Sequence, residues 1–427
     1  MVSAEFSLRP AQYPRVKRML DTAAIIRDFP LLTRIQEDGL PLCYLDSGAT
    51  SQKPQSVIQA EQDYYQTINA NVHRGIYEIS EKATEATELT RSKIRDFIHA
   101  ASSAEIVFTR NATEAINLVA RSWGEANLKA GDTVLLTELE HHANLVPWQI
   151  LSEKIGIRLE FVPVTDEFVL DMDAWHALLK QHHPKLVGIS GMSNVLGTIQ
   201  PIREMVRDAH EAGALFLMDG AQSVPHMSVD VTDLDVDFMA FSAHKMLGPT
   251  GLGVLYGKKA LLNAMPPFLG GGDMIGKVHL RSFTCNDLPY KFEAGTPAIA
   301  QEISFGYAID YLNKIGMDNV QKQEQELTDY AISRLKEIPG LKIIGPDQGE
   351  RGSAVSFTLD YVHPHDVADI LASRNVCVRA GHHCAMPLHE RFNIPATTRA
   401  SFYIYNNESD VSRLCDALMY VYKLFGD

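Results

Sequence analysis

The stretch ALFLMDGAQ at residues 214–222 contains an apolar run that ends in an acid and an amide, Asp219 and Gln222. Twenty-three residues after Gln222, the stretch DFMAFSAHK at 237–245 ends in Lys245. Both runs are typical of buried parallel strands, and ligands of doubly wound sheets bind at the carboxyl ends of such strands. We therefore expect an acid, an amide and a lysine to meet in one crevice.

Such a set of side chains matches the chemistry of pyridoxal 5'-phosphate. A lysine forms a Schiff base with the aldehyde of this cofactor, and an acid pairs with its pyridine nitrogen. On spacing alone, the alternative is that Asp219 and Lys245 are exposed separately at two strand ends. The surrounding sequence has to decide between the two interpretations.

Short apolar runs alternate with longer amphipathic stretches through the middle of the chain. The runs are 105–109, 133–137, 158–164, 185–190, 214–219, 237–242 and 253–257, and the helix candidates between them are 113–127, 144–155, 171–181 and 201–212. Such alternation predicts βαβ units and an α/β fold with a mostly parallel seven-stranded sheet.

The pattern changes after Gly- and Pro-rich loops at 248–251 and 266–272. The expected elements beyond them are helices at 315–338, 364–374 and 408–425 and strands at 341–344, 353–359 and 375–379. This order is typical of a smaller α+β domain. We expect a large domain over residues 30–300 and a small domain built from 1–29 and 301–427.

The composition of the 427-residue chain is that of an ordinary globular protein, with 45% apolar and 22% charged residues. The net charge of −14 argues against nucleic-acid binding by long-range attraction. No apolar run approaches the roughly 18 residues that a membrane span requires, so we expect no membrane partner.

Five cysteines, at positions 43, 285, 377, 384 and 415, are widely spaced and form no C-x-x-C pair. This spacing argues against a disulfide framework and predicts a reducing, cytoplasmic location. The first eighteen residues are basic, with Arg9, Arg15, Lys17 and Arg18 against Glu5. A frayed extension is favoured over a targeting peptide, because the segment has no apolar core.

Residues 110–114 follow an expected strand and begin a helix, so they are a candidate phosphate site. Backbone N–H groups at a helix start attract anions, and the hydroxyl of Thr113 is a further donor. The alternative is an ordinary cap, in which Asn111 bonds the first turn. Ser242 and His244 offer more donors nearby in the crevice, and with them the phosphate interpretation is the better one.

His141 and His142 follow the expected strand at 133–137. An imidazole in this crevice can stack on a flat cofactor and can move protons, because its pKa ordinarily lies near neutrality. The pair also raises the question of a metal site. Sequence neighbours seldom present their ring nitrogens to one ion and no third ligand is evident, so we predict no metal.

Cys384 follows Arg379, His382 and His383 in the stretch RAGHHCAMPL. Cationic neighbours lower the pKa of a thiol and make it a nucleophile. One alternative is a buried structural cysteine in a glycine-containing turn. Another is a metal site at residues 382–384, although consecutive residues chelate poorly.

Asn194 lies in SNVLG after an expected strand, and Arg399 lies in TTRAS. The arginine fork is the natural partner of a substrate carboxylate, and it keeps its charge. The alternative for any single arginine is a surface ion pair.

Taken in order, these motifs resemble those of the class V, fold-type-I pyridoxal phosphate enzymes, and specifically the group II cysteine desulfurases of the SufS/CsdB type. The matching stretches are YLDSGATSQKP (44–54), NVHRGIYEIS (71–80), TEAINLVA (113–120), EHHANLVPW (140–148), SNVLG (193–197), DGAQ (219–222), HKMLGPTGLG (244–253), FEAGTP (292–297) and RAGHHCAMP (379–387). The resemblance implies an aspartate-aminotransferase-like large domain and a smaller α+β domain.

The resemblance also implies a role for each matched residue. Lys245 would hold the cofactor and move the α-proton, Asp219 would pair with the pyridine nitrogen, and Gln222 would bond its phenolic oxygen. His141 would stack on the ring, and Cys384 would receive the sulfur. The remaining implied roles are phosphate binding by Thr113, Ser242, His244 and, from a neighbouring subunit, Thr296; carboxylate binding by Asn194 and Arg399; and lining of the entrance by His73 and Arg379.

The implied reaction converts L-cysteine to L-alanine and leaves a persulfide on Cys384, within a homodimer. The sulfur would pass to an acceptor protein of the SufE, CsdE or SufU type, most often for iron–sulfur cluster assembly. Ala112 stands where relatives often have a threonine, so we expect one hydroxyl contact fewer at the phosphate. The alternatives are a lyase acting on L-selenocysteine, another class V aminotransferase, and a non-enzymatic thiol or metal scaffold that binds no cofactor.

Overall fold

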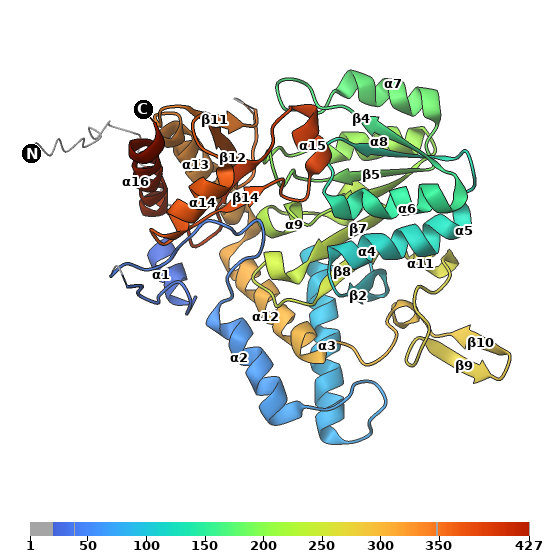
Figure 1. The fold of residues 1–427 in the computed structure, drawn as a ribbon. Coiled ribbons are helices and arrows are strands. Elements are labelled where there is room, and N and C mark those ends of the chain that lie inside the picture. Colours follow the sequence, from blue (N-terminus) through green and yellow to red (C-terminus); the bar gives the residue numbers. More distant parts are fainter. Residues whose placement is uncertain (1–19, 38, 347–348, 427) are drawn as a thin grey trace, which may run out of the picture.

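The computed structural model describes residues 20–37, 39–346 and 349–426, and a seven-stranded sheet lies at its centre (Figure 1). Its strands are β2 (Ile106–Thr109), β3 (Thr133–Thr137), β4 (Arg158–Val162), β5 (Leu186–Ser190), β6 (Leu215–Asp219), β7 (Phe238–Ser242) and β8 (Gly253–Gly257). They are ordered β2-β8-β7-β6-β5-β3-β4, and β8 runs antiparallel to both of its neighbours. The predicted α/β class and mostly parallel sheet are therefore confirmed.

Helices cover both faces of this sheet, which explains why its strands are nearly continuous apolar runs. Alternate strand residues pack to opposite sides, so that Leu136 and Leu217 lie in one apolar cluster while Leu135 and Phe216 lie in another. The helices of the first cluster include α4 (Ala112–Leu118) and α6 (Val146–Ile155), and those of the second include α7 (Met172–His182) and α8 (Ile202–Glu211). Each face of the sheet therefore has its own apolar core, formed between the strands and the helices that cover that face.

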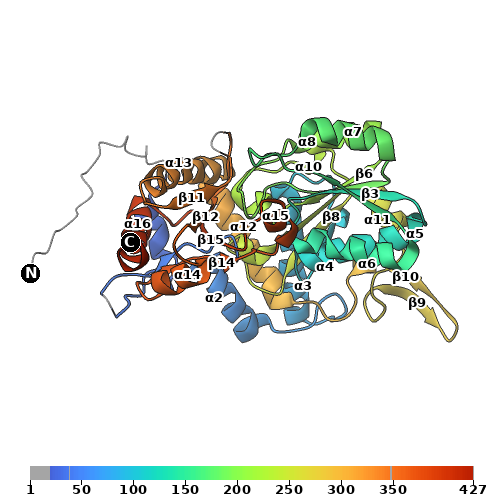
Figure 2. The same cartoon turned by 45° about the horizontal axis from the view of Figure 1, so that its top comes forward.

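A second, antiparallel sheet lies beside the first, with its own helices (Figure 2). Its strands are β11 (Leu341–Ile344), β12 (Ala354–Leu359), β15 (Thr397–Ser401) and β14 (Arg379–Gly381), in that order across the sheet. The helices α13 (Met317–Leu335), α14 (Pro364–Ala372) and α16 (Glu408–Phe425) belong to the same part of the chain. The division of the chain at residues 30 and 300 stays a prediction.

Two expected elements are interrupted. The strand expected at 375–379 is divided into β13 (Val376–Cys377), which pairs with β1 (Cys43–Tyr44), and β14, which pairs with β15. The helix expected at 113–127 continues from α4 into a π-helical turn, Val119–Gly124, and then α5 (Glu125–Asn127). Gly124 lies at this turn against Leu151, where an added Cβ would come within 2.9 Å of the leucine side chain. A tight helix contact therefore accompanies the irregular turn.

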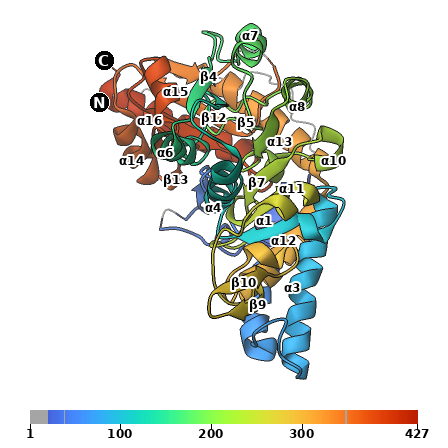
Figure 3. The ribbon, with the colours of Figure 1, turned by 90° about the vertical axis from the view of Figure 1, so that its right-hand side faces the viewer.

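Sequence periodicity missed the long helix α3 (Glu78–Phe97), because its buried face is mostly small and polar. Ser80, Ala83, Thr87 and Thr90 are buried there, so no apolar stripe is visible in the sequence. The helices α2 (Gln55–Asp63) and α12 (Ile299–Ile315) and the hairpin of β9 (Ile275–His279) and β10 (Ser282–Cys285) were also not expected. Figure 3 shows α3 running past α12, and Gly306 of α12 provides the room for Thr90.

The start of the described chain packs against the rest of the molecule through α1 (Thr22–Arg27) and the following turn. Phe29 is fully buried there, with its ring edge-on to Tyr311 and Tyr405. The basic residues expected to form a frayed extension (Arg9, Arg15, Lys17 and Arg18) lie outside the described residues. Within the described ranges, no helix is both long and apolar enough to cross a bilayer.

Candidate active site

A cavity of about 230 Å³ opens where the carboxyl ends of the central strands meet the second sheet. Asp219 is the last residue of β6 and Ser242 the last of β7, so the sheet itself brings the two motifs together. The predicted site residues in the cavity wall are Ala112, Thr113, His141, Asn194, Asp219, Gln222, Ser242, His244, Lys245, Arg379, Cys384 and Arg399. Asp219 and Lys245 thus share one crevice and are not exposed separately.

Asp219 is buried and Lys245 is half-buried, and each affects the charge of the other. Burial raises the pKa of the Asp219 carboxyl, whereas a hydrogen bond of 2.9 Å from the Ala221 N–H to Oδ1 and the nearby Lys245 oppose this shift. Burial lowers the pKa of the Lys245 ammonium to about 8, and the Asp219 charge works against that change. Lys245 is therefore much closer to being a neutral amine at physiological pH than a surface lysine is.

The turn that carries Lys245 is held at the preceding carbonyl, that of His244. Four donors converge on this oxygen: the Ser51 N–H at 3.0 Å, Lys53 Nζ at 2.9 Å, and the hydroxyls of Thr50 and Ser51 at 3.1 Å each. No role was predicted for these residues, although they lie in the quoted stretch YLDSGATSQKP. Their spacing around a carbonyl appears only once the chain is folded.

The candidate phosphate end contains the helix cap that was the alternative interpretation. Asn111 Oδ1 accepts a hydrogen bond of 2.9 Å from the Glu114 N–H, and Ser242 Oγ accepts one of 2.8 Å from the Ala112 N–H. The cap does not use the hydroxyl of Thr113, which lines the cavity. A capped helix start and an anion site are therefore compatible at this position.

His141 differs from the expectation of a pKa near neutrality. Burial, followed by the charge of Lys245, lowers the pKa of its imidazole to about 3. Its Nδ1 accepts the Ala143 N–H at 3.0 Å, so the proton of the neutral ring is on Nε2. His141 is thus a neutral ring suited to stacking.

Glu140 was not singled out from the sequence, yet it fixes the turn that carries His141. Its carboxyl is buried and accepts hydrogen bonds from Thr137 Oγ1 and Asn144 Nδ2 at 2.7 Å each and from Ser190 Oγ at 2.8 Å. Burial raises its pKa to about 7, while these donors oppose the shift. A fully bonded buried acid of this kind is a structural support for the strand end.

The environment of Cys384 corrects the prediction that its neighbour His383 is cationic. Burial, together with the charge of Arg399, lowers the pKa of His383 to about 2, so this imidazole is neutral at physiological pH. The cations in the cavity wall near Cys384 are Arg379, Arg399 and Lys245. The basic side chains that share this wall with Cys384 are therefore two arginines and a lysine, whereas His383 is neutral.

Asn194 and Arg399 lie side by side in the cavity wall. Arg399 Nη1 donates to the Asn194 carbonyl at 2.9 Å and Nη2 to Asp46 Oδ1 at 3.2 Å, while Nε is buried without a partner. Asn194 Nδ2 donates to the His383 carbonyl at 2.6 Å. Arg399 is 2% exposed, so the alternative of a surface ion pair does not apply to it.

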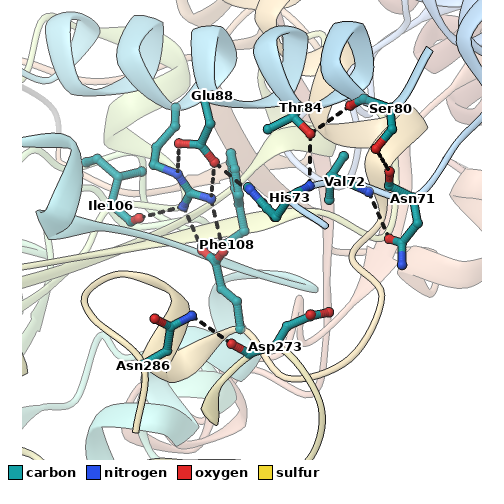
Figure 4. Close-up of polar contacts among 12 residues, drawn as sticks. Asn71, Val72, His73, Ser80, Thr84, Glu88, Ile106, Phe108, Asp273 and Asn286 are labelled. Carbon is teal, nitrogen blue, oxygen red and sulfur yellow. Dashed lines mark hydrogen bonds and ion pairs between the residues drawn. The ribbon is translucent and has the colours of Figure 1, made fainter. Parts of the chain in front are cut away.

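Two predicted site residues lie outside this cavity within the chain. His73 has φ 68°, its backbone N–H bonds Thr84 Oγ1 at 2.9 Å, and its ring lies near Glu88 (Figure 4). The His73 ring also lies edge-on to Tyr290. Thr296 lines a separate cavity of about 400 Å³. The predicted reach of Thr296 to a neighbouring subunit stays a prediction.

A buried ion pair supports the segment that precedes Thr296. Arg91, 1% exposed, donates to Glu293 Oε1 at 2.6 Å and Oε2 at 2.9 Å, and also contacts Glu88. Glu293 in turn accepts the Phe108 N–H at 2.7 Å. This pair joins α3 to the edge strand β2 and to the FEAGTP segment.

The residues in the cavity that contains Lys245 fit pyridoxal 5'-phosphate. A buried amine of lowered pKa stands near a buried carboxyl, as a covalent link and a pyridine nitrogen require. Thr113, Ser242 and His244 surround a helix start, and the unpartnered Nε of Arg399 is available to a carboxylate. A ring, a phosphate and an amino acid therefore each have matching groups.

The protein-family model described as aminotransferase class-V matches residues 43–414. A probable cysteine desulfurase of Streptomyces coelicolor is 48% identical, over 96% of this chain and 99% of that protein. The cysteine desulfurase of Haloferax volcanii is 47% identical, over 95% and 98% of the two chains.

Solved structures agree with these relatives. The cysteine desulfurase CsdA of Escherichia coli superimposes with a TM-score of 0.88 at 35% identity, covering 96% of this chain and all of that one. The enzyme of Thermococcus onnurineus does so with a TM-score of 0.90 at 38% identity, covering 95% and 99%. With its fold, its cavity and these likenesses, the chain belongs to the class V aminotransferase family and, within it, to the cysteine desulfurases, whose cofactor is pyridoxal 5'-phosphate.

Proposed function

We propose that this protein takes the sulfur of L-cysteine onto Cys384 as a persulfide and releases L-alanine. The observation that supports this most directly is the shared cavity, which has the buried amine of Lys245 and the thiol of Cys384 in its wall. The Cys384 charge is close enough to oppose the lowering of the Lys245 pKa. A cofactor lysine alone would serve many reactions, whereas a thiol opposite it suits the transfer of sulfur.

The chain's own residues bind and orient the reactants. Pyridoxal phosphate, when bound, supplies an electron sink for the bonds at the substrate α-carbon. Asp219 would keep the proton on its pyridine nitrogen, and His141 would cover its ring. Gln222 already donates one N–H to the Gly48 carbonyl at 2.9 Å, and its second N–H would bond the phenolic oxygen.

Lys245 would hold the cofactor and then move the α-proton. Its lowered pKa means that the released amine can accept this proton near neutral pH. Arg399 and Asn194 would hold the substrate carboxylate, since Arg399 Nε is unpartnered and both side chains line the cavity. The substrate sulfur would then be directed towards Cys384.

The sulfur step needs no external oxidant or reductant. The Cys384 thiolate forms a bond to the substrate sulfur as the bond from that sulfur to Cβ breaks, and the carbon skeleton keeps the electron pair. A proton taken up at Cβ completes L-alanine, and the enzyme is left with one added sulfur atom. The cationic wall of Arg379 and Arg399 stabilises the thiolate that begins this step.

We further propose the group II assignment and its consequences, which rest on the stretch RAGHHCAMP. The persulfide would pass to an acceptor protein of the SufE, CsdE or SufU type, for iron–sulfur cluster assembly. A cytoplasmic homodimer would place Thr296, and with it His73, at the neighbouring cavity. Neither Thr296 nor His73 lines the cavity of its own chain that contains Lys245, which is compatible with a role at the cavity of a neighbouring subunit.

The test is alanine release from L-cysteine under a reductant, comparing the native chain with Cys384→Ala. We expect alanine only from the native chain, with the cofactor absorbance equal in both. Cys285→Ala, which removes another partly exposed cysteine, is the matched control and should behave as the native chain. Native rates of alanine release from Cys384→Ala would contradict the assignment. Activity of that variant confined to L-selenocysteine would favour the lyase alternative.

A further inference from the structure

The loop that carries Cys384 has an unfavourable backbone conformation. His383 has φ 52° and Cys384 has φ 59°, both in the left-handed region that residues with a Cβ seldom occupy. Two such residues in succession persist only where surrounding contacts hold them, and such strain is common at functional sites. The contacts that hold this loop therefore decide where the Cys384 thiol lies.

One set of contacts holds the loop from its buried side. Asn194 Nδ2 donates to the His383 carbonyl at 2.6 Å, and the His383 Nε2 is 2.9 Å from Thr397 Oγ1. His389 Nε2 is 3.2 Å from the same hydroxyl. These groups are buried, so they anchor the start of the loop and are not accessible from outside.

The other set comes from His142, on the cofactor side of the cavity. The backbone N–H of His142 donates to the Cys384 carbonyl at 2.7 Å, and the imidazole Nε2 of His142 accepts the backbone N–H of Met386 at 3.1 Å. His142 thus bonds the loop on both sides of Ala385. Unlike the buried contacts, these lie at the surface, since Met386 is 43% exposed and His142 is half-buried.

The bond from Met386 requires an unprotonated Nε2 on His142. Burial, followed by the charge of His382, lowers the pKa of His142, so the imidazole is neutral at physiological pH. The other titratable groups nearby are His141, which is also neutral there, and Cys384 itself. The acceptor nitrogen is therefore available under the conditions in which the enzyme works.

We propose that His142 is a positioning residue whose imidazole latches the Cys384 loop closed by accepting the Met386 N–H. With the latch closed, the thiol faces the cavity; with it open, His383 and Cys384 relax from their left-handed conformation and the partly exposed Cys384 becomes more accessible. The latch deepens the proposed function, because it controls access to the sulfur-carrying residue. The role of Cys384 as that residue rests on the proposed function.

The test uses the holoenzyme and measures how fast iodoacetamide alkylates Cys384, followed by mass spectrometry. His142→Ala removes the acceptor, whereas His142→Gln places an amide oxygen near the position of Nε2. We expect at least fivefold faster alkylation of Cys384 in His142→Ala and near-native alkylation in His142→Gln. Cys285 in the same samples is the internal reference, and His176→Ala, an exposed histidine on α7, is the matched control.

Two further readouts separate a latch from a general loss of structure. Hydrogen exchange of the peptide covering residues 379–388 should be faster in His142→Ala, while the cofactor absorbance stays native. The kcat for alanine formation should fall several-fold with little change in KM, and His142→Gln should restore it. Native alkylation and exchange in His142→Ala, or no rescue by His142→Gln, would overturn the latch.

The measurements of Cys384 alkylation and of hydrogen exchange do not require the enzyme to turn over L-cysteine. If the latch results hold but the native chain releases no alanine, the proposed function fails and the latch stands. If alanine is released normally but His142→Ala leaves the Cys384 loop unchanged, the latch fails and the function stands.

Discussion

Lys245 and Cys384 face the same cavity, but the chain holds them in different ways. Lys245 follows β7, a fully buried strand bonded to neighbours on both sides, and its turn is fixed through the His244 carbonyl. Cys384 lies in an irregular loop after the short edge strand β14. Side-chain hydrogen bonds and single backbone bonds, and not a strand ladder, hold this loop.

We call the strand ends with Asp219, Ser242 and Lys245 the cofactor wall, and the loop with His383 and Cys384 the nucleophile wall. The difference in how they are held fits their separate proposed tasks. A cofactor must keep one orientation through the reaction, which favours a site built on rigid strand ends. A sulfur carrier must first point inward, towards the substrate, and later present its sulfur to an acceptor. Hydrogen bonds from side chains can be released one at a time, whereas a strand inside a sheet cannot move alone.

Substitution of Lys245 should have the largest effect. In the proposed function, Lys245 holds the cofactor and moves the α-proton, so we expect Lys245→Ala to lower alanine formation by about 10³-fold or more. The measurement is alanine release, with the absorbance of the bound cofactor recorded on the same sample. In contrast to Cys384→Ala, the cofactor spectrum of this variant should change. An unchanged cofactor spectrum in Lys245→Ala would contradict the view that Lys245, unlike Cys384, is linked to the cofactor.

The cofactor wall could be predicted from the sequence because it follows from strand ends. Apolar runs marked β6 and β7, and polar residues placed directly after them had to meet at one edge of the sheet. Asp219, Ser242 and Lys245 are therefore local features that the topology brings together. The motif resemblance then added His73 and Thr296, which lie outside this cavity within the chain.

The nucleophile wall could be predicted only in part. The motif indicated Cys384. Histidine and cysteine rarely adopt a positive φ, so the sequence gives no sign that His383 and Cys384 do so here. The neutral charge of His383 follows from burial, which sequence neighbours do not reveal. Helix α3 was missed for a related reason, since Arg91 is buried by its pairing with Glu293 from a distant segment.

The pH dependence of cofactor binding tests how deeply the cofactor wall is buried. Burial lowers the pKa of Lys245 to about 8, and only the neutral amine can attack the cofactor aldehyde. The rate at which the cofactor-free protein regains its covalent cofactor should therefore rise up to about tenfold per pH unit below 8 and level off above it. Stopped-flow absorbance across pH 6–10 measures this rate. A rise that continues to the ordinary lysine pKa near 10.4 would show an exposed amine.

The smallest expected effect concerns the buried anchor of the nucleophile wall. Thr397→Val removes the hydroxyl between His383 and His389, so a buried imidazole nitrogen loses its partner at a cost of about 1–3 kcal/mol in the free energy of unfolding. We also expect about threefold slower alanine formation and faster alkylation of Cys384, with an unchanged cofactor spectrum.

Thr398→Val is the matched control for this anchor, because Thr398 is the next residue of β15 and bonds the Pro364 carbonyl at 3.3 Å, away from the cavity. It should also lower the thermal midpoint, since it too loses a buried hydrogen bond, but it should leave Cys384 alkylation native. If the two valine variants alter Cys384 equally, the anchor acts only through overall stability. If only Thr397→Val does, the position of the thiol depends on individual side-chain bonds, as the contrast between the two walls requires.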